Sequence, residues 1–296
     1  MVADIHTLFT SDFYRIVDFK CRCVDCRTSK PEYSDSFCIS FVRTGNFLFN
    51  VFRNSLDSYT GCVLVTKPGY ERTVTHVHTV PDECTIFDFK TDFYHALLGY
   101  YGRDKFFRSN DLHSTLVKTS PETEFLHYQI LRRVLTGEGT KLEIDQLVME
   151  VAHKILKNVI PYKADEKINA RLKRNHLVTI ERAKAYITEH FTNDISLTEI
   201  ADHCHVSPFH FSRIFKTFTL TAPHQFLLSV RLKQAELLLR NTTMPVMDIA
   251  FSSGFNSIEH FTSAFSNRYK MPPAQFRHSG RVSVDGTTTI QYSKIS

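Results

Sequence analysis

The sequence predicts an α+β protein of two domains, in which a β-rich unit followed by helices precedes an all-α domain. Two observations support this prediction. The hydrophobic period changes from strand-like to helix-like after about residue 90, and one helical pattern occurs twice in the last third of the chain. At 296 residues the chain exceeds the usual size of one domain. Its 42% hydrophobic residues are enough to build packed cores, which excludes a disordered chain.

Residues from about 10 to 90 show the pattern of short strands. In "SFCISFVRTGNFLFNVF" and "GCVLVTKPGYERTVTHVHTV", β-branched and aromatic residues alternate around turn signals such as Thr44-Gly45-Asn46 and Lys67-Pro68-Gly69. Several short strands at this spacing predict a small sandwich or barrel.

Residues 91–160 change to a helical period. The segments 121–137 and 143–160 place apolar residues three and four positions apart, so both are expected to be amphipathic helices. Two such helices after a β unit commonly pack on each other or on a second subunit.

The polar, charge-rich stretch 161–175 predicts a linker between a first domain, 1–160, and a helical domain, 176–281. The charge balance also changes there. Residues 1–162 hold 19 Lys and Arg against 20 Asp and Glu, whereas residues 163–281 hold 16 against 10. The basic excess therefore lies in the second half, where it mildly indicates a nucleic-acid partner.

A short pattern occurs twice in the helical domain. "IADHCHVSPFHFSRIF" at 200–215 is followed by "IAFSSGFNSIEHFTSAF" at 249–265, and both contain Ile-Ala, a turn, a serine cap and spaced phenylalanines. In the first copy, a helix is expected to begin at Leu197, with Ser196 and Glu199 at capping-box spacing. Helix, short turn and helix make the helix-turn-helix pattern, whose second helix enters the major groove of DNA.

The second helix of each copy has one apolar and one outward face. In the first copy Phe211, Ile214, Phe215 and Phe218 recur at helical spacing and are expected to be buried, as are Phe261 and Phe265 in the second copy. The outward residues differ between the copies, as expected if each copy contacts a different part of its partner. These candidate DNA-binding residues are Phe209, His210, Ser212, Arg213, Lys216 and Thr217 in the first copy and Ile258, Glu259, His260, Thr262, Ser263 and Asn267 in the second.

Side-chain chemistry suggests different roles within this set. Arg213 can donate two hydrogen bonds to guanine, and Glu259 can accept one from cytosine. Lys216 and Asn267 lie later in their helices and are expected to touch phosphates, which position the protein without specifying a sequence. The intervening helical segment 222–241 would be about 30 Å long, close to one duplex turn of roughly 34 Å. One chain could then recognise two successive major-groove segments; the alternative is a helical bundle in which the repeat serves only packing.

On these motifs, residues 177–277 resemble the DNA-binding domain of the AraC/XylS family of bacterial transcription regulators. "IAFSSGFNSIEHFTSAFSNRYKMPPAQFR" is especially similar to the family signature and ends in its Pro-Pro-x-x-Phe-Arg. The chain departs at Leu220-Thr221, where the family usually has glycine, and this departure is expected to alter a turn. The N-terminal layout is similar to the family's cupin-like domain for effector binding and dimerisation.

The resemblance implies a sequence-specific transcription regulator, most of whose relatives are activators. It implies double-stranded DNA and RNA polymerase as partners, a homodimer, and a small-molecule effector that the sequence does not identify. The expected location is the bacterial cytoplasm, with the protein on the nucleoid when bound, because the sequence shows neither a charged-then-apolar leader nor an apolar run long enough to cross a membrane. The polar tail 282–296 is expected to stay unfolded.

The motif "CRCVDC" is the main feature outside the helical domain. The chain's seven cysteines do not suggest a disulfide framework and fit a reducing compartment. The clustered thiols could bind zinc, could sense oxidants or electrophiles, or could be small buried strand residues. The candidate metal ligands are Cys21, Cys23 and Cys26, with a fourth ligand drawn from Cys38, Cys84, His76 or His78.

No enzymatic activity is expected, because the sequence holds no Gly-rich phosphate loop, no G-x-S-x-G elbow and no H-E-x-x-H helix. Two alternatives of other classes remain open. One is a DNA alkylation response or repair protein that accepts a methyl group on a cysteine of the cluster. The other is a cupin with a catalytic metal, suggested by His76-Val77-His78.

Overall fold

The computed structural model describes residues 3–279 apart from 23–27, 53, 78–80, 103 and 160–167. The predicted tail 282–296 and the first part of the predicted linker, residues 161–167, therefore lie outside the described residues. The chain divides into two compact units: the first is Met1–His190 with Ile195–Val230, and the second is Phe191–Asp194 with Arg231–Ser296.

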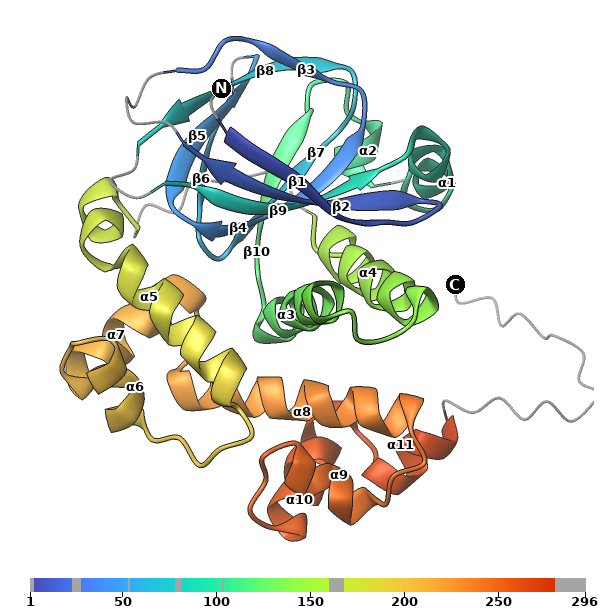
Figure 1. Cartoon of the computed structure of the whole chain (residues 1–296), viewed down its shortest axis with the longest axis vertical. Coiled ribbons are helices and arrows are strands. Elements are labelled where there is room, and N and C mark those ends of the chain that lie inside the picture. Colours follow the sequence, from blue (N-terminus) through green and yellow to red (C-terminus); the bar gives the residue numbers. More distant parts are fainter. Residues whose placement is uncertain are drawn as a thin grey trace, which may run out of the picture. The chain divides into compact units, whose positions relative to one another are not determined.

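The N-terminal part of the first unit contains two antiparallel sheets (Figure 1). Its described strands are β1 (Ala3–Thr10), β2 (Tyr14–Cys21), β3 (Glu32–Ser34), β4 (Phe37–Thr44), β5 (Asn46–Val51), β6 (Asn54–Tyr59), β7 (Cys62–Thr66), β8 (Tyr70–His76), β9 (Glu83–Phe89) and β10 (Ser114–Lys118). The larger sheet has the order β1-β2-β9-β4-β7-β10 and the smaller has the order β3-β8-β5-β6. This arrangement confirms the predicted β-rich unit, while its likeness to a cupin stays a prediction.

Burial follows the pleat in the smaller sheet and not in the centre of the larger one. In β5, Phe47, Phe49 and Val51 are buried and alternate with half-buried residues, as expected for a strand with one covered face. β7 is buried at every position, so both faces of this strand are covered.

Among the described residues, the helices that follow or interrupt these strands are α1 (Thr91–Tyr101), α2 (Lys105–Arg108), α3 (Pro121–Thr136) and α4 (Lys141–Leu156). The predicted helices 121–137 and 143–160 are thus confirmed and pack on each other as α3 and α4. The side-chain hydroxyl of Tyr14 in β2 donates a 2.7 Å hydrogen bond to Asp145 in α4, which ties this helix to the larger sheet.

The β unit extends beyond its predicted limits of 10 and 90. β1 begins at Ala3, and Ser114–Lys118 returns to the sheet as β10 within the region 91–160, which we predicted to be helical. β10 pairs with β7, with Leu116 opposite Leu64. Its five residues are too few to show a period, so a distant partner strand decides their conformation.

The remainder of the described chain is helical, as predicted. Its helices are α5 (Ala170–His190), α6 (Leu197–His203), α7 (Pro208–Thr219), α8 (Pro223–Asn241), α9 (Val246–Ser252), α10 (Ile258–Tyr269) and α11 (Pro273–Ser279). α5 begins within the predicted linker, at Ala170, behind Asn169, whose side chain accepts a hydrogen bond from the Leu172 N–H. None of the described helices combines the length and the apolar character that a membrane span requires.

Within the first unit, α5 is anchored to the β unit by charged side chains. Glu181 accepts hydrogen bonds from the Thr60 hydroxyl (2.5 Å) and the Gly45 N–H (3.1 Å). Lys184 pairs with Glu124 of α3 at 2.6 Å. Burial raises the pKa of Glu181, and these donors counteract that effect. The predicted division into domains 1–160 and 176–281 stays a prediction, because in this structure α5 packs on both the β unit and the first helix-turn-helix.

His127 of α3 is a buried neutral group in this unit. Its ring stacks on Phe41 of β4, with the ring centres 4.2 Å apart and the planes 3° apart. Burial lowers the pKa of His127 to about 3, and the positive charges of Arg43 and Lys184 act in the same direction. The unfolded chain would instead take up a proton at this histidine near pH 6.5.

The first prediction concerns acid stability. Because the folded pKa of His127 lies below its unfolded value, its stabilising contribution is complete above about pH 6.5 and falls as the pH decreases towards 3. Between pH 7.5 and pH 5 this loss amounts to about 2 kcal/mol. His127→Phe, which can still stack on Phe41, should show that much less acid destabilisation in urea unfolding, whereas the exposed control His224→Gln should match the wild type. Equal acid loss in His127→Phe and the wild type would contradict the assignment.

Candidate nucleic-acid interface

The two sequence repeats form the same turn. In the first copy the Val206 N–H donates to the Ala201 carbonyl at 3.0 Å, and in the second copy the Phe255 N–H donates to the Ala250 carbonyl at 3.1 Å. Both alanines are fully buried. The residue before each donor has a left-handed backbone, with φ of 58° at His205 and 85° at Gly254. The predicted helix-turn-helix repeat is therefore present in the backbone geometry of each unit.

The helix starts around these turns follow the local signals. Ser196 and Glu199 form the predicted capping box at α6. Ser257 accepts a 3.2 Å hydrogen bond from the His260 N–H at the start of α10. Ser207 occupies the cap position of α7 ahead of Pro208, but its side chain makes no cap hydrogen bond. Proline at the first helical position compensates because it has no N–H to satisfy.

In the first unit, α7 presents one buried and one exposed face. Its buried residues are Phe211, Ile214, Phe215 and Phe218, as predicted. Phe209, Arg213 and Lys216 are exposed, with 81% of Phe209 accessible. These three side chains are therefore accessible to a partner.

In the second unit, α10 is divided in the same way. Phe261 and Phe265 are buried, and Phe255 from the turn packs on Phe261 with ring centres 5.1 Å apart. Glu259, His260 and Asn267 are exposed. None of the twelve candidate DNA-binding residues is buried, so all of them lie where a partner could reach them; their contacts with DNA stay a prediction.

A histidine of α5 lies beside the first recognition helix. The rings of His176 and His210 are edge-to-face with centres 5.0 Å apart. Burial lowers the pKa of His176, and the charges of His210 and Arg213 lower it further. The sequence pattern did not identify His176, because only the fold brings α5 against α7. Protonation of His176 is opposed by its burial and by these neighbouring charges, and a bound phosphate would favour it.

Two basic residues of α8 in the second unit, Arg231 and Lys233, are structural. Arg231 donates to the Phe191 carbonyl (2.8 Å) and to the Asn193 carbonyl (2.7 Å), which holds the segment preceding α6. Lys233 is fully buried and pairs with Glu236 at 2.7 Å. Neither side chain is available for nucleic acid.

The predicted departure from the family pattern lies at a helix end. Leu220 follows α7 in the left-handed conformation, with φ of 59°, and its N–H donates to the Lys216 carbonyl. Lys270 ends α10 in the same way, with φ of 63°. Leu220 thus adopts the conformation that glycine would reach without strain, and the predicted alteration of the turn stays a prediction.

The structure also shows where part of the cysteine motif lies. Cys21 ends β2 and is buried, whereas Cys23 and Cys26 fall outside the described residues, as does His78. Cys21 lies beside His76, with Sγ 3.8 Å from Nδ1, and His76 in turn lies beside Asp82. The sequence prediction included Cys21 and His76 among its candidate metal ligands but missed Asp82. Cys38 lies apart from them, beside Ser36 and Asp88.

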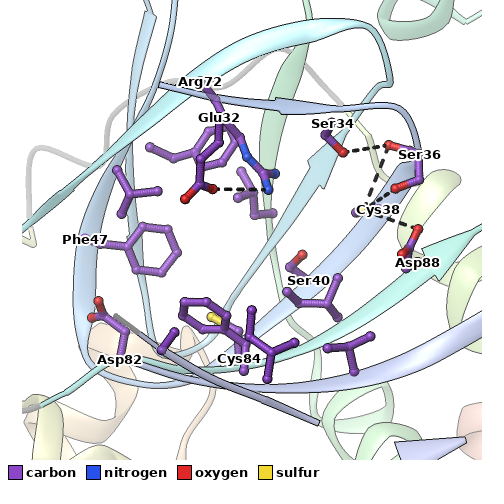
Figure 2. Close-up of a pocket in the computed structure, with 18 of the residues that line it drawn as sticks. Glu32, Ser34, Ser36, Cys38, Ser40, Phe47, Arg72, Asp82, Cys84 and Asp88 are labelled. Atoms are coloured by element: carbon purple, nitrogen blue, oxygen red, sulfur yellow. Dashed lines mark hydrogen bonds and ion pairs between the residues drawn. The ribbon is translucent and has the colours of Figure 1, made fainter. Parts of the chain in front are cut away.

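The β unit encloses a cavity of about 310 Å³ (Figure 2). Asp82, Phe47 and Cys84 lie on one side of it and Arg72 on another. Arg72 pairs with Glu32 at 3.9 Å. The wall of this cavity is mainly apolar with a few polar groups, which is typical of a small-molecule site.

Comparison with known proteins gives a consistent family assignment for the helical part. Residues 200–279 match the family model described as a helix-turn-helix domain. The chain is 32% identical over 142 residues to an uncharacterized HTH-type transcriptional regulator of Haemophilus influenzae, covering 48% of this chain and 47% of that protein. It is 32% identical over 149 residues to the HTH-type transcriptional activator RhaS of Escherichia fergusonii, covering 50% of each.

The chain carries an AraC/XylS-type helix-turn-helix domain. A further relative is the bifunctional transcriptional activator/DNA repair enzyme AdaA of Bacillus subtilis, 31% identical over 97 residues that cover 33% of this chain and 46% of that protein. The chain therefore spans about half the length of these relatives.

The second prediction concerns the turn of the second copy in the AraC-type domain. A Cβ at Gly254 would lie 2.5 Å from the Phe191 carbonyl oxygen and 2.9 Å from the Thr192 Cα, and its φ of +85° disfavours any side chain. Gly254→Ala should therefore lower the free energy of unfolding by about 3 kcal/mol. Gly137→Ala is the matched control, because Gly137 has a similar φ of +72° with nothing within 4 Å.

Gly137→Ala should lower the free energy of unfolding only by the strain of the left-handed backbone, about 1 kcal/mol. Denaturant unfolding of the two variants beside the wild type measures both values. If Gly254→Ala were no less stable than Gly137→Ala, the close packing at this turn would be refuted.

Proposed function

We propose that this protein is a sequence-specific DNA-binding transcription regulator that recognises two successive major-groove segments with α7 and α10. The observation that carries the proposal is the repeated turn: two equivalent backbone hydrogen bonds fix two helices whose buried residues match and whose exposed residues differ. Two units built only for packing would not require different exposed faces. The match of residues 200–279 to a helix-turn-helix family supports the same function.

The two exposed faces differ in hydrogen-bonding chemistry. Arg213 presents a planar donor that suits guanine, whereas Glu259 is an acceptor that suits cytosine. Lys216 lies one turn further along α7 and is assigned to a phosphate. The 19 residues of α8 correspond to about 28 Å of helix, comparable to one turn of duplex DNA.

The N-terminal part of the first unit, which contains the β unit, is proposed to sense a signal and to mediate homodimerisation. Its cavity supplies a site for a small molecule. α5 packs on β4 and also on α6 and α7, which connects the β unit to the first helix-turn-helix within the same unit. We propose that the protein activates transcription, as the name of the RhaS relative states for that protein, and that it does so by contacting RNA polymerase. A regulator of this kind would act in the cytoplasm, on the nucleoid.

A DNA repair function is the second candidate, because one relative is named as both an activator and a repair enzyme. Methyl transfer needs an accessible thiolate. The five cysteines that the structure describes are all buried, so this part of the chain favours regulation. Incubation with DNA carrying labelled methyl groups separates the two functions: a label that stays on the protein would support repair.

The third prediction concerns base specificity. Selection of duplexes from a random pool by the full chain should yield two short motifs about one helical turn apart. Arg213→Ala should relax one motif and Glu259→Ala the other, each by about 1–3 kcal/mol of discrimination. The matched controls Arg132→Ala and Glu138→Ala remove exposed charges near the end of α3 and should leave both motifs unchanged.

A selection that returned only sequence-independent binding, or none, would show that the repeat serves packing. If Arg213→Ala relaxed both motifs equally, the assignment of one helix to one segment would be wrong.

The fourth prediction concerns phosphate contact. Lys216→Ala should weaken binding to all sequences alike and reduce the slope of log affinity against log salt by about 0.9, because one fewer counterion is released. Lys157→Ala, an exposed lysine at the end of α4, should leave the slope unchanged. Affinities measured at four salt concentrations give both slopes. A sequence-dependent loss in Lys216→Ala would assign this lysine to a base.

A further inference from the structure

Three side chains with metal-binding chemistry meet where the two sheets of the β unit approach each other. Cys21 is the last residue of β2, His76 is the last residue of β8, and Asp82 directly precedes β9. β2 and β9 belong to the larger sheet and β8 to the smaller. The three residues are 2%, 4% and 1% exposed. Burial of an imidazole and a carboxyl group costs free energy unless they are paired with each other or bind a metal ion.

The distances between the donor atoms suit a single ion. Cys21 Sγ lies 3.8 Å from His76 Nδ1, Nδ1 lies 2.8 Å from Asp82 Oδ2, and the three ligand atoms lie within 4.8 Å of one another. Around tetrahedral zinc, bond lengths of about 2.0–2.3 Å place sulfur and nitrogen about 3.6 Å apart and nitrogen and oxygen about 3.4 Å apart. The sulfur–nitrogen separation already fits, and an ion would replace the direct hydrogen bond between His76 and Asp82 by a movement of about half an ångström.

The backbone around the cluster holds Asp82 in place. The Cys21 N–H donates to the Asp82 carbonyl at 2.8 Å, so two of the three ligands belong to paired strands. The Asn46 N–H hydrogen-bonds to the Asp82 carboxyl group. A Cβ at Gly45 would lie 2.5 Å from Asp82 Oδ1, and Gly45 has a φ of +82°, so glycine is required beside the carboxyl group. These contacts orient the ligand as outer-shell partners do in metal sites.

The site also has an open side. His76 and Asp82 line the cavity, and Figure 2 shows Asp82 at its wall beside Phe47. Zinc sites that also bind water or a small molecule have three protein ligands and an open fourth position, whereas closed structural sites use four protein ligands. The thiolate excludes Mg²⁺ and Ca²⁺, which prefer oxygen ligands.

We propose that Cys21, His76 and Asp82 bind one divalent ion of the zinc type, with the fourth coordination position open to the cavity. Binding forms a metal–sulfur, a metal–nitrogen and a metal–oxygen bond, and the protons of the thiol and of the histidine–aspartate hydrogen bond pass to solvent. Water, or a donor atom of a small molecule in the cavity, completes the coordination. The inference is independent of whether α7 and α10 bind DNA.

Titration of the full chain with Co²⁺, after removal of bound metal by a chelator, tests this site. The expected result is one Co²⁺ per chain with the strong visible bands of tetrahedral cobalt and a near-ultraviolet sulfur-to-cobalt band, both displaced by Zn²⁺. Cys21→Ser should abolish the sulfur band. His76→Gln and the nearly isosteric Asp82→Asn should weaken binding at least tenfold, by the scale of metal-site substitutions.

Cys38→Ser is the matched control, because Cys38 is a buried thiol that lines the same cavity outside the cluster. It should bind Co²⁺ as the wild type does. A double variant, Cys23→Ser with Cys26→Ser, should also keep the sulfur band. Zn²⁺ should raise the melting temperature of the wild type and of Cys38→Ser but not that of Asp82→Asn. A cooperative melting transition of Asp82→Asn without Zn²⁺ would show that this variant has lost the site and not its fold.

Failure of the wild type to bind Co²⁺ at micromolar concentration would overturn the proposal. So would a sulfur band that persists in Cys21→Ser, or one that disappears in the Cys23→Ser, Cys26→Ser variant, since the thiolate would then come from another cysteine. Loss of binding in Cys38→Ser would likewise overturn it, because Cys38 would then be a ligand of the metal.

Discussion

The backbone hydrogen bond across each helix-turn-helix turn is the interaction on which the candidate interface depends. In both copies it runs from a turn residue back to the carbonyl of a fully buried alanine, Ala201 or Ala250. A side chain larger than alanine would separate the two helices at this point, and a residue unable to take a positive φ would prevent the turn. The direction of the second helix follows from these two requirements. Because the buried phenylalanines then fix its rotation, the exposed residues of α7 and α10 are free to differ.

The buried charges of the second unit serve the same rigid framework. Lys233 and Glu236 form a buried ion pair on α8, which the half-exposed Arg240 extends to solvent by pairing with Glu236. The Tyr269 hydroxyl of α10 donates to Glu236 at 3.0 Å. A buried ion pair adds little net stability, but removal of one partner leaves an uncompensated charge. The pairs therefore favour one position of α10 against α8. This specificity is useful where a helix must be held in a defined orientation towards a partner.

Much of the helical part could be predicted from the sequence because its signals are local. The capping box at Ser196 placed the start of α6, and the turn and phenylalanine spacing placed α7 and α10. The approach of His176 to His210 could not be predicted, because it depends on how α5 packs. The same holds for the β unit. The alternating pattern predicted strands, but β10 depended on its pairing with β7, and Asp82 reached Cys21 and His76 only through the order of strands in the two sheets.

The central claim is that α7 and α10 occupy two major-groove segments of one duplex. Methylation interference at guanine N7, an atom exposed in the major groove, tests it directly. With the full chain bound to a selected duplex, the account predicts two clusters of interfering guanines whose centres are about one helical turn, roughly 10 base pairs, apart on one face of the DNA. Arg213→Ala should remove interference from one cluster only. A single cluster, or interference that is insensitive to Arg213→Ala and Glu259→Ala, would contradict the account.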